Sequence, residues 1–139
     1  RVPFIIRWPR KIPAGTTCTE LAASIDLLPT LAEVAGAKFP EEELDGKNII
    51  DLFTAKKDAK SPHKYYFLVH NGQAVRSGNW KYHKKQVYSV TDKARRFDGP
   101  ALYNLKNDIG ESKNLIDQYP EIAQRLANAL DEHLHEISE

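Results

Sequence analysis

The segment from His83 to Pro100 carries the side chains best suited to chemistry with an anion. It connects two expected strands through about 15 residues, and connections of that length in compact domains are often functional. Its cations are interleaved with aromatic rings: Lys84, Lys85, Tyr88, Lys93, Arg95, Arg96 and Phe97. Paired cations can hold an anionic group, and arginine does so through two parallel hydrogen bonds. The alternative is an exposed basic loop without a ligand.

The histidines and the single cysteine give weaker signals. His133 and His135 lie two residues apart on an expected helix and point to different sides, so they cannot chelate one ion. We expect structural roles for His63, at a domain junction, and for His70, at the start of an Asn-Gly turn. Cys18 has no catalytic context and is expected to be an inert thiol.

Composition limits the possible partners. Lysine and arginine total 20, and aspartate and glutamate total 19, so overall charge gives no argument for a nucleic-acid or membrane partner. No apolar run approaches the roughly 20 residues that span a bilayer. No stretch of the sequence repeats carboxylates at calcium-ligand spacing. We therefore interpret the acidic run Glu41 to Glu43 as a solvated surface segment and not as a calcium site. The chain has no Met and begins Arg-Val-Pro, so we expect that an upstream part was removed.

The first 60 residues show a buried strand and a helix. Val2 to Trp8 is almost continuously apolar, as in a strand covered on both faces, yet no comparable strand follows to pair with it. Pro29 is acceptable only in a first helical turn, so Asp26 is expected to cap the helix through its carboxylate, with Gly36 as the stop. A catalytic role for Asp26 is the weaker alternative. Four residues of this helix share an apolar face: Leu28, Leu31, Ala32 and Ala35.

The remaining residues predict an antiparallel sheet covered by a helix. Aromatic and β-branched residues, hairpin turns and alternation indicate four strands: Tyr65 to Val69, Gln73 to Arg76, Trp80 to His83 and Ala101 to Leu105. Pro120 suits a first helical position. After it, Ile122, Leu126, Leu130, Leu134 and Ile137 recur at spacings of three and four. We expect that stripe to pack on the sheet.

Four segments in order carry a family resemblance. They are Arg-Val-Pro-Phe-Ile-Ile-Arg-Trp-Pro at 1–9, Ser-Ile-Asp-Leu-Leu-Pro-Thr at 24–30, Ala-Val-Arg-Ser-Gly-Asn-Trp-Lys at 74–81 and Leu-Tyr-Asn-Leu-Lys-Asn-Asp-Ile-Gly-Glu-Ser-Lys-Asn-Leu at 102–115. Together they closely resemble the C-terminal part of formylglycine-dependent sulfatases, the arylsulfatase family of the alkaline phosphatase superfamily. Arg10 and Ile109 depart from the family's usual Gly and Pro, which puts the geometry of two turns in doubt.

The resemblance implies an α+β fold in two parts. Residues 1–60 would be one strand and helix of a larger α/β domain, and residues 61–139 a C-terminal subdomain with a four-stranded antiparallel sheet packed on a terminal helix. In that family the nucleophile is an oxidised Cys or Ser in a Cys/Ser-x-Pro/Ala-x-Arg motif, and calcium is held by acidic and amide side chains. Cys18 is followed by Thr-Glu-Leu-Ala, and no Ser fits the motif. The family's catalytic lysine would precede Arg1.

We therefore predict no catalytic and no metal-binding residue in this chain, and assign calcium and formylglycine to the parent enzyme. Family members line the substrate entrance with loops of this subdomain, so the resemblance implies substrate-binding roles for His83, Lys84, Arg95 and Arg96. The expected partners are a sulfated small molecule or glycan and the N-terminal catalytic part, with neither nucleic acid nor membrane. The family implies a periplasmic, secreted or lysosomal location.

The expected activity of the parent is hydrolysis of sulfate esters, with this fragment inactive alone. One alternative is a phosphonate or phosphodiester hydrolase of the same superfamily, which a different upstream nucleophile motif would indicate. Another is a non-catalytic module that binds acidic glycans. The strand expected at Val2 to Trp8 argues against an independent module, because its sheet partners are missing.

Overall fold

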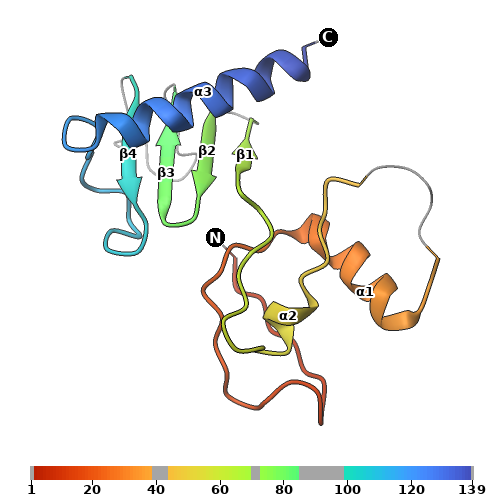
Figure 1. Cartoon of the computed structure of the whole chain (residues 1–139). Helices are drawn as coiled ribbons and strands as arrows, with labels where there is room; N and C mark the ends of the chain where they lie inside the picture. Colours follow the sequence, from red (N-terminus) through yellow and green to blue (C-terminus); the bar gives the residue numbers. More distant parts are fainter. Residues whose placement is uncertain (1, 39–43, 70–72, 85–98, 139) are drawn as a thin grey trace. The chain divides into compact units, whose positions relative to one another are not determined.

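The structure, a computed structural model, describes residues 2–38, 44–69, 73–84 and 99–138. The chain forms two compact units, residues 1–63 and 64–139. The first contains a 3-10 turn and two short helices, and the second contains four strands and a long helix (Figure 1). The fold class is α+β, as predicted.

The second unit contains an antiparallel sheet with strand order β1-β2-β3-β4. Its strands are β1 (Tyr66–Leu68), β2 (Ala74–Ser77), β3 (Trp80–His83) and β4 (Ala101–Asn104). Val75 pairs with Tyr82, and Tyr82 pairs with Leu102, so these three side chains form a row on one face. This confirms the predicted four-stranded sheet.

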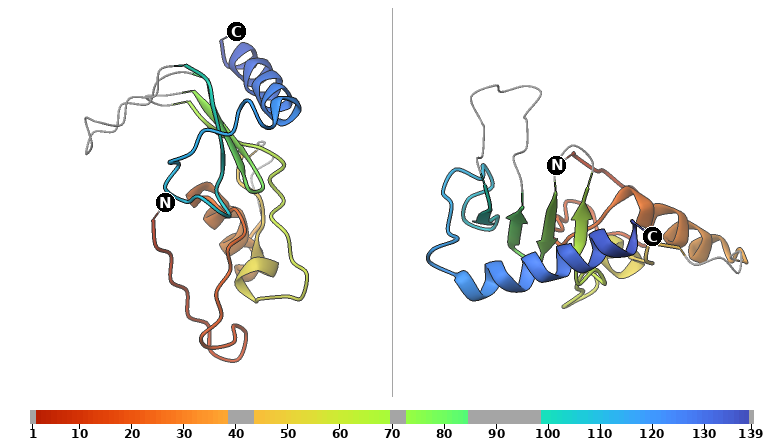
Figure 2. Two further views of the ribbon diagram at one scale, coloured as in Figure 1. Left: turned by 90° about the vertical axis from the view of Figure 1, so that its left-hand side faces the viewer. Right: turned by 90° about the horizontal axis from the view of Figure 1, so that it is seen from above.

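Helix α3 (Pro120–Glu136) lies across that face of the sheet (Figures 1 and 2). Leu126 and Leu130 are completely buried in one core cluster with Val75, Tyr82 and Leu102. Full burial of such a side chain is worth about 1.5–3 kcal/mol. The residues flanking these leucines in the predicted stripe, Ile122 and Leu134, are partly buried against the same cluster, whereas Ile137 is the exposed C-cap.

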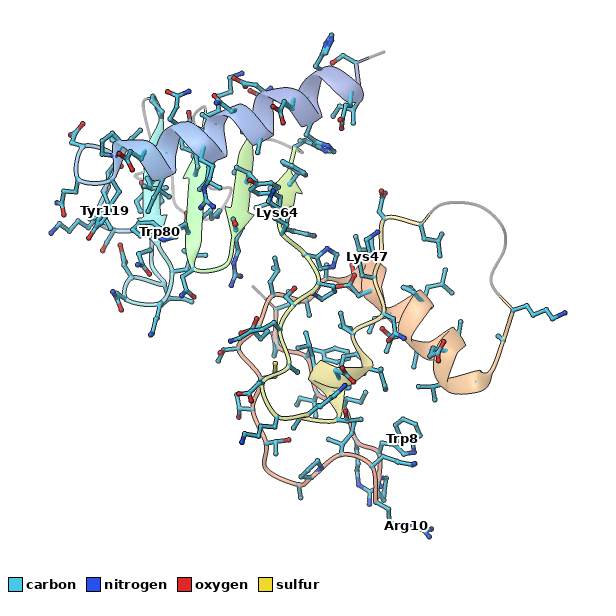
Figure 3. All side chains as sticks on the ribbon, in the orientation of Figure 1. Trp8, Arg10, Lys47, Lys64, Trp80 and Tyr119 are labelled. Carbon is cyan, nitrogen blue, oxygen red and sulfur yellow. The ribbon has the colours of Figure 1, made fainter. Side chains whose placement is uncertain are left out.

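Aromatic contacts fix both ends of α3 to the sheet. Tyr119, immediately before the helix, lies 4.9 Å from Trp80 of β3, measured between ring centroids (Figure 3). Near the other end, the ring of His133 stacks on Phe67 of β1 at 3.9 Å. His133 is therefore part of the packing between helix and sheet.

The first unit is built around a small apolar cluster. After the 3-10 turn η1 (Ser24–Asp26), helix α1 (Leu27–Ala35) ends at Gly36, which adopts the left-handed conformation with φ 63°. This confirms the predicted stop. Helix α2 (Ile50–Phe53) contributes Leu52 and Phe53 to the cluster, which Ile49 completes.

The strand predicted for Val2 to Trp8 does not form in this chain. The segment has no assigned secondary structure, and Val2 and Ile5 are 87% and 92% exposed. Ile6 packs against the α2 cluster, and the Phe4 ring stacks on Phe53 at 5.5 Å. A strand requires a ladder partner, and the described residues of this unit offer none. The chain by itself therefore shows no strand here, and the prediction that this segment joins the sheet of a larger domain stays a prediction.

Helix α1 also leaves its apolar face largely uncovered. Leu28 and Leu31, which define that face, are 62% and 54% exposed, and Ile25 and Val34 are also exposed. No helix among the described residues is long and apolar enough to cross a membrane.

Candidate functional site

The structure describes two of the four residues predicted to bind substrate. His83 is the last residue of β3, and Lys84 follows it with its backbone N–H donating to the carbonyl of Gln73 at 2.7 Å. Arg95 and Arg96 lie outside the described residues.

Strand alternation sends Lys81 and His83 to the face of the sheet opposite α3. Tyr82, between them, belongs to the core under α3, and successive side chains of a strand point to opposite faces. The imidazole Nε2 of His83 lies 2.9 Å from Oε2 of Glu111, and Nζ of Lys81 lies 2.7 Å from Oε1 of the same carboxylate. The His83 side chain is 4% exposed. Its ring also meets Tyr103 edge-on at 5.8 Å.

Glu111 is held in its charged form by these contacts. Burial alone would raise its pKa, but hydrogen bonds from His83 and Lys81, together with their charges, outweigh burial and lower the pKa from 4.5 to about 2. Its backbone is in the left-handed region, with φ 54°. Asp108 braces the same turn by accepting hydrogen bonds from the backbone N–H groups of Ser112 and Lys113.

Lys84 interacts on the α3 side of the unit. Its Nζ lies 2.5 Å from Oδ1 of Asp131 in α3, and the two side chains are 37% and 53% exposed. Burial raises the pKa of Tyr82, with a further increase from Asp131 that Lys84 opposes. His83 and Lys84 therefore have partners on different elements, and the structure does not bring their side chains together.

Sequence reasoning missed Glu111 as the partner of this face. The signal available in the sequence was the alternation of Lys81 and His83, two cation-forming side chains on one face of a short strand. When two such side chains are buried on one face, we expect a nearby carboxylate to pair with them, because unpaired buried charges are costly. The carboxylate comes from a turn 28 residues after His83, so spacing alone did not identify it.

In the first unit, Asp26 does not cap α1 as predicted. It occupies the N-cap position, but its side chain makes no capping hydrogen bond to that helix. The completely buried carboxylate instead accepts from the backbone N–H of Ala23 at 2.8 Å and of Lys47 at 2.9 Å. His63 Nε2 lies 2.7 Å from Oδ1. The carboxylate thus connects the segments of Ala23, Lys47 and His63 instead of capping α1. The capping prediction was therefore wrong.

Thr30 and Gly46 complete this cluster, which we call the Asp26 cluster (Asp26, Thr30, Gly46 and His63). The Thr30 hydroxyl donates to the backbone carbonyl of Asp26 at 2.6 Å and accepts from the N–H of Ile49 at 3.0 Å. A Cβ at Gly46 would lie 2.1 Å from the carbonyl oxygen of Ile25. Gly46 therefore permits the close approach that brings Lys47 to Asp26.

No group of three or more His, Cys, Asp or Glu among residues 2–38, 44–69, 73–84 and 99–138 is arranged to hold an ion. Cys18 is exposed and borders a pocket of about 240 Å³ with Thr19, Leu52 and Lys56. In place of a metal site, the described residues contain the ion pairs of Glu111 with Lys81 and His83 and the buried Asp26 cluster.

The comparison with protein families decides the assignment. A family model described as N-sulphoglucosamine sulphohydrolase, C-terminal, matches residues 1–139. This chain belongs to that family of sulfatase C-terminal domains. The family resemblance of the four sequence segments is thereby confirmed.

Relatives show how much of a sulfatase this domain represents. Arylsulfatase A from Bos taurus is 36% identical over 149 aligned positions, which cover 94% of this chain and 29% of the bovine protein. The chain thus spans under a third of the length of that curated relative.

Solved sulfatase structures share the fold of the domain. A Bacteroides thetaiotaomicron structure, reported with the metabolism of multiple glycosaminoglycans, has a TM-score of 0.75 and 26% identity over 94% of this chain and 28% of its own. The structure of Ps i-CgsB in complex with k-i-k-neocarrahexaose has a TM-score of 0.67 and 26% identity, covering 90% of this chain and 27% of its own. The domain therefore has the fold of the matched part of each solved structure, which is under a third of that structure's chain.

Proposed function

We propose that this domain is the C-terminal part of an enzyme that hydrolyses sulfate esters. The observation that carries the proposal is the family match over residues 1–139, supported by 36% identity to bovine arylsulfatase A. Because the domain spans 29% of that relative, the activity belongs to the whole protein. We expect the domain alone to be inactive.

The reactive groups are proposed to lie in a preceding part of the same protein. The described residues offer no group of three or more potential ligands for a metal ion, so they do not fit a calcium site. Cys18 lacks the Pro/Ala and Arg that a formylglycine motif requires. We assign the formylglycine nucleophile and the calcium ion to that preceding part.

The first unit is proposed to complete the larger α/β domain. Val2 and Ile5, and on α1 Leu28 and Leu31, are each more than half exposed. Burial of apolar surface against another part of the protein stabilises the folded state by about 25 cal/mol per Å². A neighbouring sheet would also supply the ladder partner that residues 2–8 lack in this chain.

The substrate is proposed to be a sulfated small molecule or glycan. Lys84, which is partly exposed, and Arg95 and Arg96 supply cations of the type that bind a sulfate group. His83 is buried against Glu111, so its proposed part in substrate binding is to fix the end of β3. The similar Ps i-CgsB was solved with a neocarrahexaose, which supports a carbohydrate. A periplasmic, secreted or lysosomal location remains part of the proposal.

Reconstitution tests the proposal directly. The domain, its preceding part and the two combined are assayed with an aryl sulfate, an aryl phosphonate and an aryl phosphodiester. We expect turnover of the sulfate by the full-length protein and none by the domain alone. Preference for the phosphonate or phosphodiester would favour the other hydrolase class, and sulfate turnover by the isolated domain would contradict the assignment of the reactive groups. Tight binding of an acidic glycan by the domain, with no activity from the combination, would favour a binding module.

A further inference from the structure

The connection between β4 and α3 folds back against the sheet. We call residues 105–113 the strap. At its start, the backbone N–H of Leu105 donates to the carbonyl of Asn79 at 2.7 Å. Just beyond its end, the N–H of Leu115 donates to the carbonyl of Leu102 at 2.8 Å, next to the free edge of β4. Both ends of the strap are therefore hydrogen-bonded to the sheet unit.

Glu111 fixes the middle of the strap. Each oxygen of its carboxylate meets a different side chain of β3, Lys81 at 2.7 Å and His83 at 2.9 Å. The left-handed backbone at Glu111, with φ 54°, is unfavourable for a residue with a Cβ. The contacts of the carboxylate with Lys81 and His83 offset the steric cost of this backbone conformation. Loss of the carboxylate would therefore favour opening of the strap.

The face beneath Glu111 is well buried. Tyr103 is 1% exposed and forms a small cluster with the buried Ala101 and Leu105. Tyr103 alternates with Leu102, which belongs to the core under α3, so Tyr103 lies on the opposite face with His83. Opening of the strap would expose this second face, while the core under α3 could remain intact.

We propose that Glu111 is a clasp that holds the strap closed in mild acid and releases it, ahead of the α3 core, only in strong acid. Among the described residues, the charged groups that face Glu111 are Lys81 and His83 from β3, with Asp108 on the strap itself. The low pKa of Glu111, about 2, keeps the carboxylate charged at the pH of acidic compartments. Asp108 stays charged as well, because the backbone N–H of Lys113 lowers its pKa. The inference does not depend on the proposed sulfatase activity.

Hydrogen–deuterium exchange on the 139-residue chain tests the clasp. Protection is measured in steps from about pH 7 through about pH 4.5 to about pH 2, with correction for the intrinsic exchange rate at each pH. The variant is Glu111→Gln, and the matched control is Glu132→Gln, which changes an exposed carboxylate of α3. Lys81→Met provides a second variant that keeps Glu111 but removes one of its partners.

We expect equal protection of the wild-type strap at pH 7 and pH 4.5, and loss of that protection before α3 loses its own near pH 2. Glu111→Gln should lower protection of the strap about tenfold at pH 7 and leave it below that of α3, while Glu132→Gln remains like the wild type. An unchanged strap in Glu111→Gln, equal protection of strap and α3 in that variant, opening of the wild-type strap by pH 4.5, or simultaneous loss of strap and α3 near pH 2 would each overturn the proposal. Should Glu111→Gln not fold, Lys81→Met decides: opening at a higher pH than wild type supports the clasp, and opening at the same pH overturns it.

Discussion

His63 and Asp26 form a buried pair in which imidazole Nε2 lies 2.7 Å from carboxylate Oδ1, with side chains 7% and 0% exposed. Lys56 and Asp51 are separated by the same distance on the surface of the same unit, but are 64% and 52% exposed. The same separation between ion-pair atoms therefore occurs once in a buried pair and once in an exposed pair. Removing a partner from a buried pair leaves a desolvated group, whereas water replaces the partner of an exposed one.

Asp26→Asn should destabilise the first unit by about 2–4 kcal/mol, because the carboxylate serves His63 and two backbone N–H groups. Asp51→Asn, the matched control, should cost less than about 1 kcal/mol. Urea unfolding monitored in the first unit measures both changes. Similar losses from the two variants would show that burial of the Asp26 cluster contributes little.

Gly46→Ala should be among the most damaging single substitutions in the first unit. The added Cβ would lie 2.1 Å from the carbonyl oxygen and 2.6 Å from the carbonyl carbon of Ile25, and backbone atoms cannot move aside independently. We expect a loss of about 3 kcal/mol or more. At Gly36 a Cβ would meet nothing within 4 Å, so Gly36→Ala should cost only about 1 kcal/mol for its left-handed backbone. Thermal unfolding compares the two, and equal costs would contradict the close approach.

The sheet and α3 could be predicted from sequence because their signals are local. Residue types and turn signals indicated the strands that contain Val75 and Tyr82, and the spacing of Leu126 and Leu130 placed both on one side of a helix. Each of these side chains packs against apolar residues of the same unit. In the second unit, the faces indicated by the sequence pattern are therefore the faces that are buried.

The predictions that failed or that this chain does not test concern residues whose partners are distant in sequence or lie outside the described residues. Residues 2–8 have the composition of a buried strand, but a strand forms only where another backbone accepts its hydrogen bonds. Asp26 was expected to cap its own helix, but its carboxylate is used by Lys47 and His63, which lie 21 and 37 residues away in sequence. Glu111 was missed for the same reason. Spacing along a chain does not encode such long-range polar contacts.

Glu111→Gln should change how stability depends on pH. The pKa of Glu111 is about 2 in the folded chain and 4.5 ordinarily, so its stabilising effect is present above about pH 4.5 and is lost as the pH falls toward 2. The variant should lose on the order of 2 kcal/mol at neutral pH, where the charged carboxylate is replaced by a neutral amide. Unfolding free energies measured across that window should converge for variant and wild type at low pH. A constant difference between them at every pH would contradict this assignment.

Arg10→Gly should stabilise the first unit by about 0.5–1 kcal/mol. Arg10, labelled with Trp8 in Figure 3, has φ 71°. In its turn the N–H groups of Lys11 and Ile12 both donate to the carbonyl of Trp8. Glycine adopts that conformation without the steric cost, although it gives back part of the gain through a more flexible unfolded state. The matched control is Lys11→Gly, at a neighbour without a positive φ, which should destabilise slightly. Urea midpoints that move in the same direction for both variants would show that backbone strain at Arg10 is negligible.

Replacement of Arg95 and Arg96 by Gln should raise KM for a sulfated glycan about tenfold in the full-length protein, with kcat nearly unchanged. The expected reason is loss of two cations that hold a sulfate group away from the reacting bond. Lys57→Gln, which removes an exposed cation of the first unit, serves as the control for overall charge. Steady-state kinetics at several salt concentrations should show a weaker salt dependence of KM for the double variant than for the control. A fall in kcat with KM unchanged would place these arginines near the reacting bond, and no change in either constant would remove them from the substrate site.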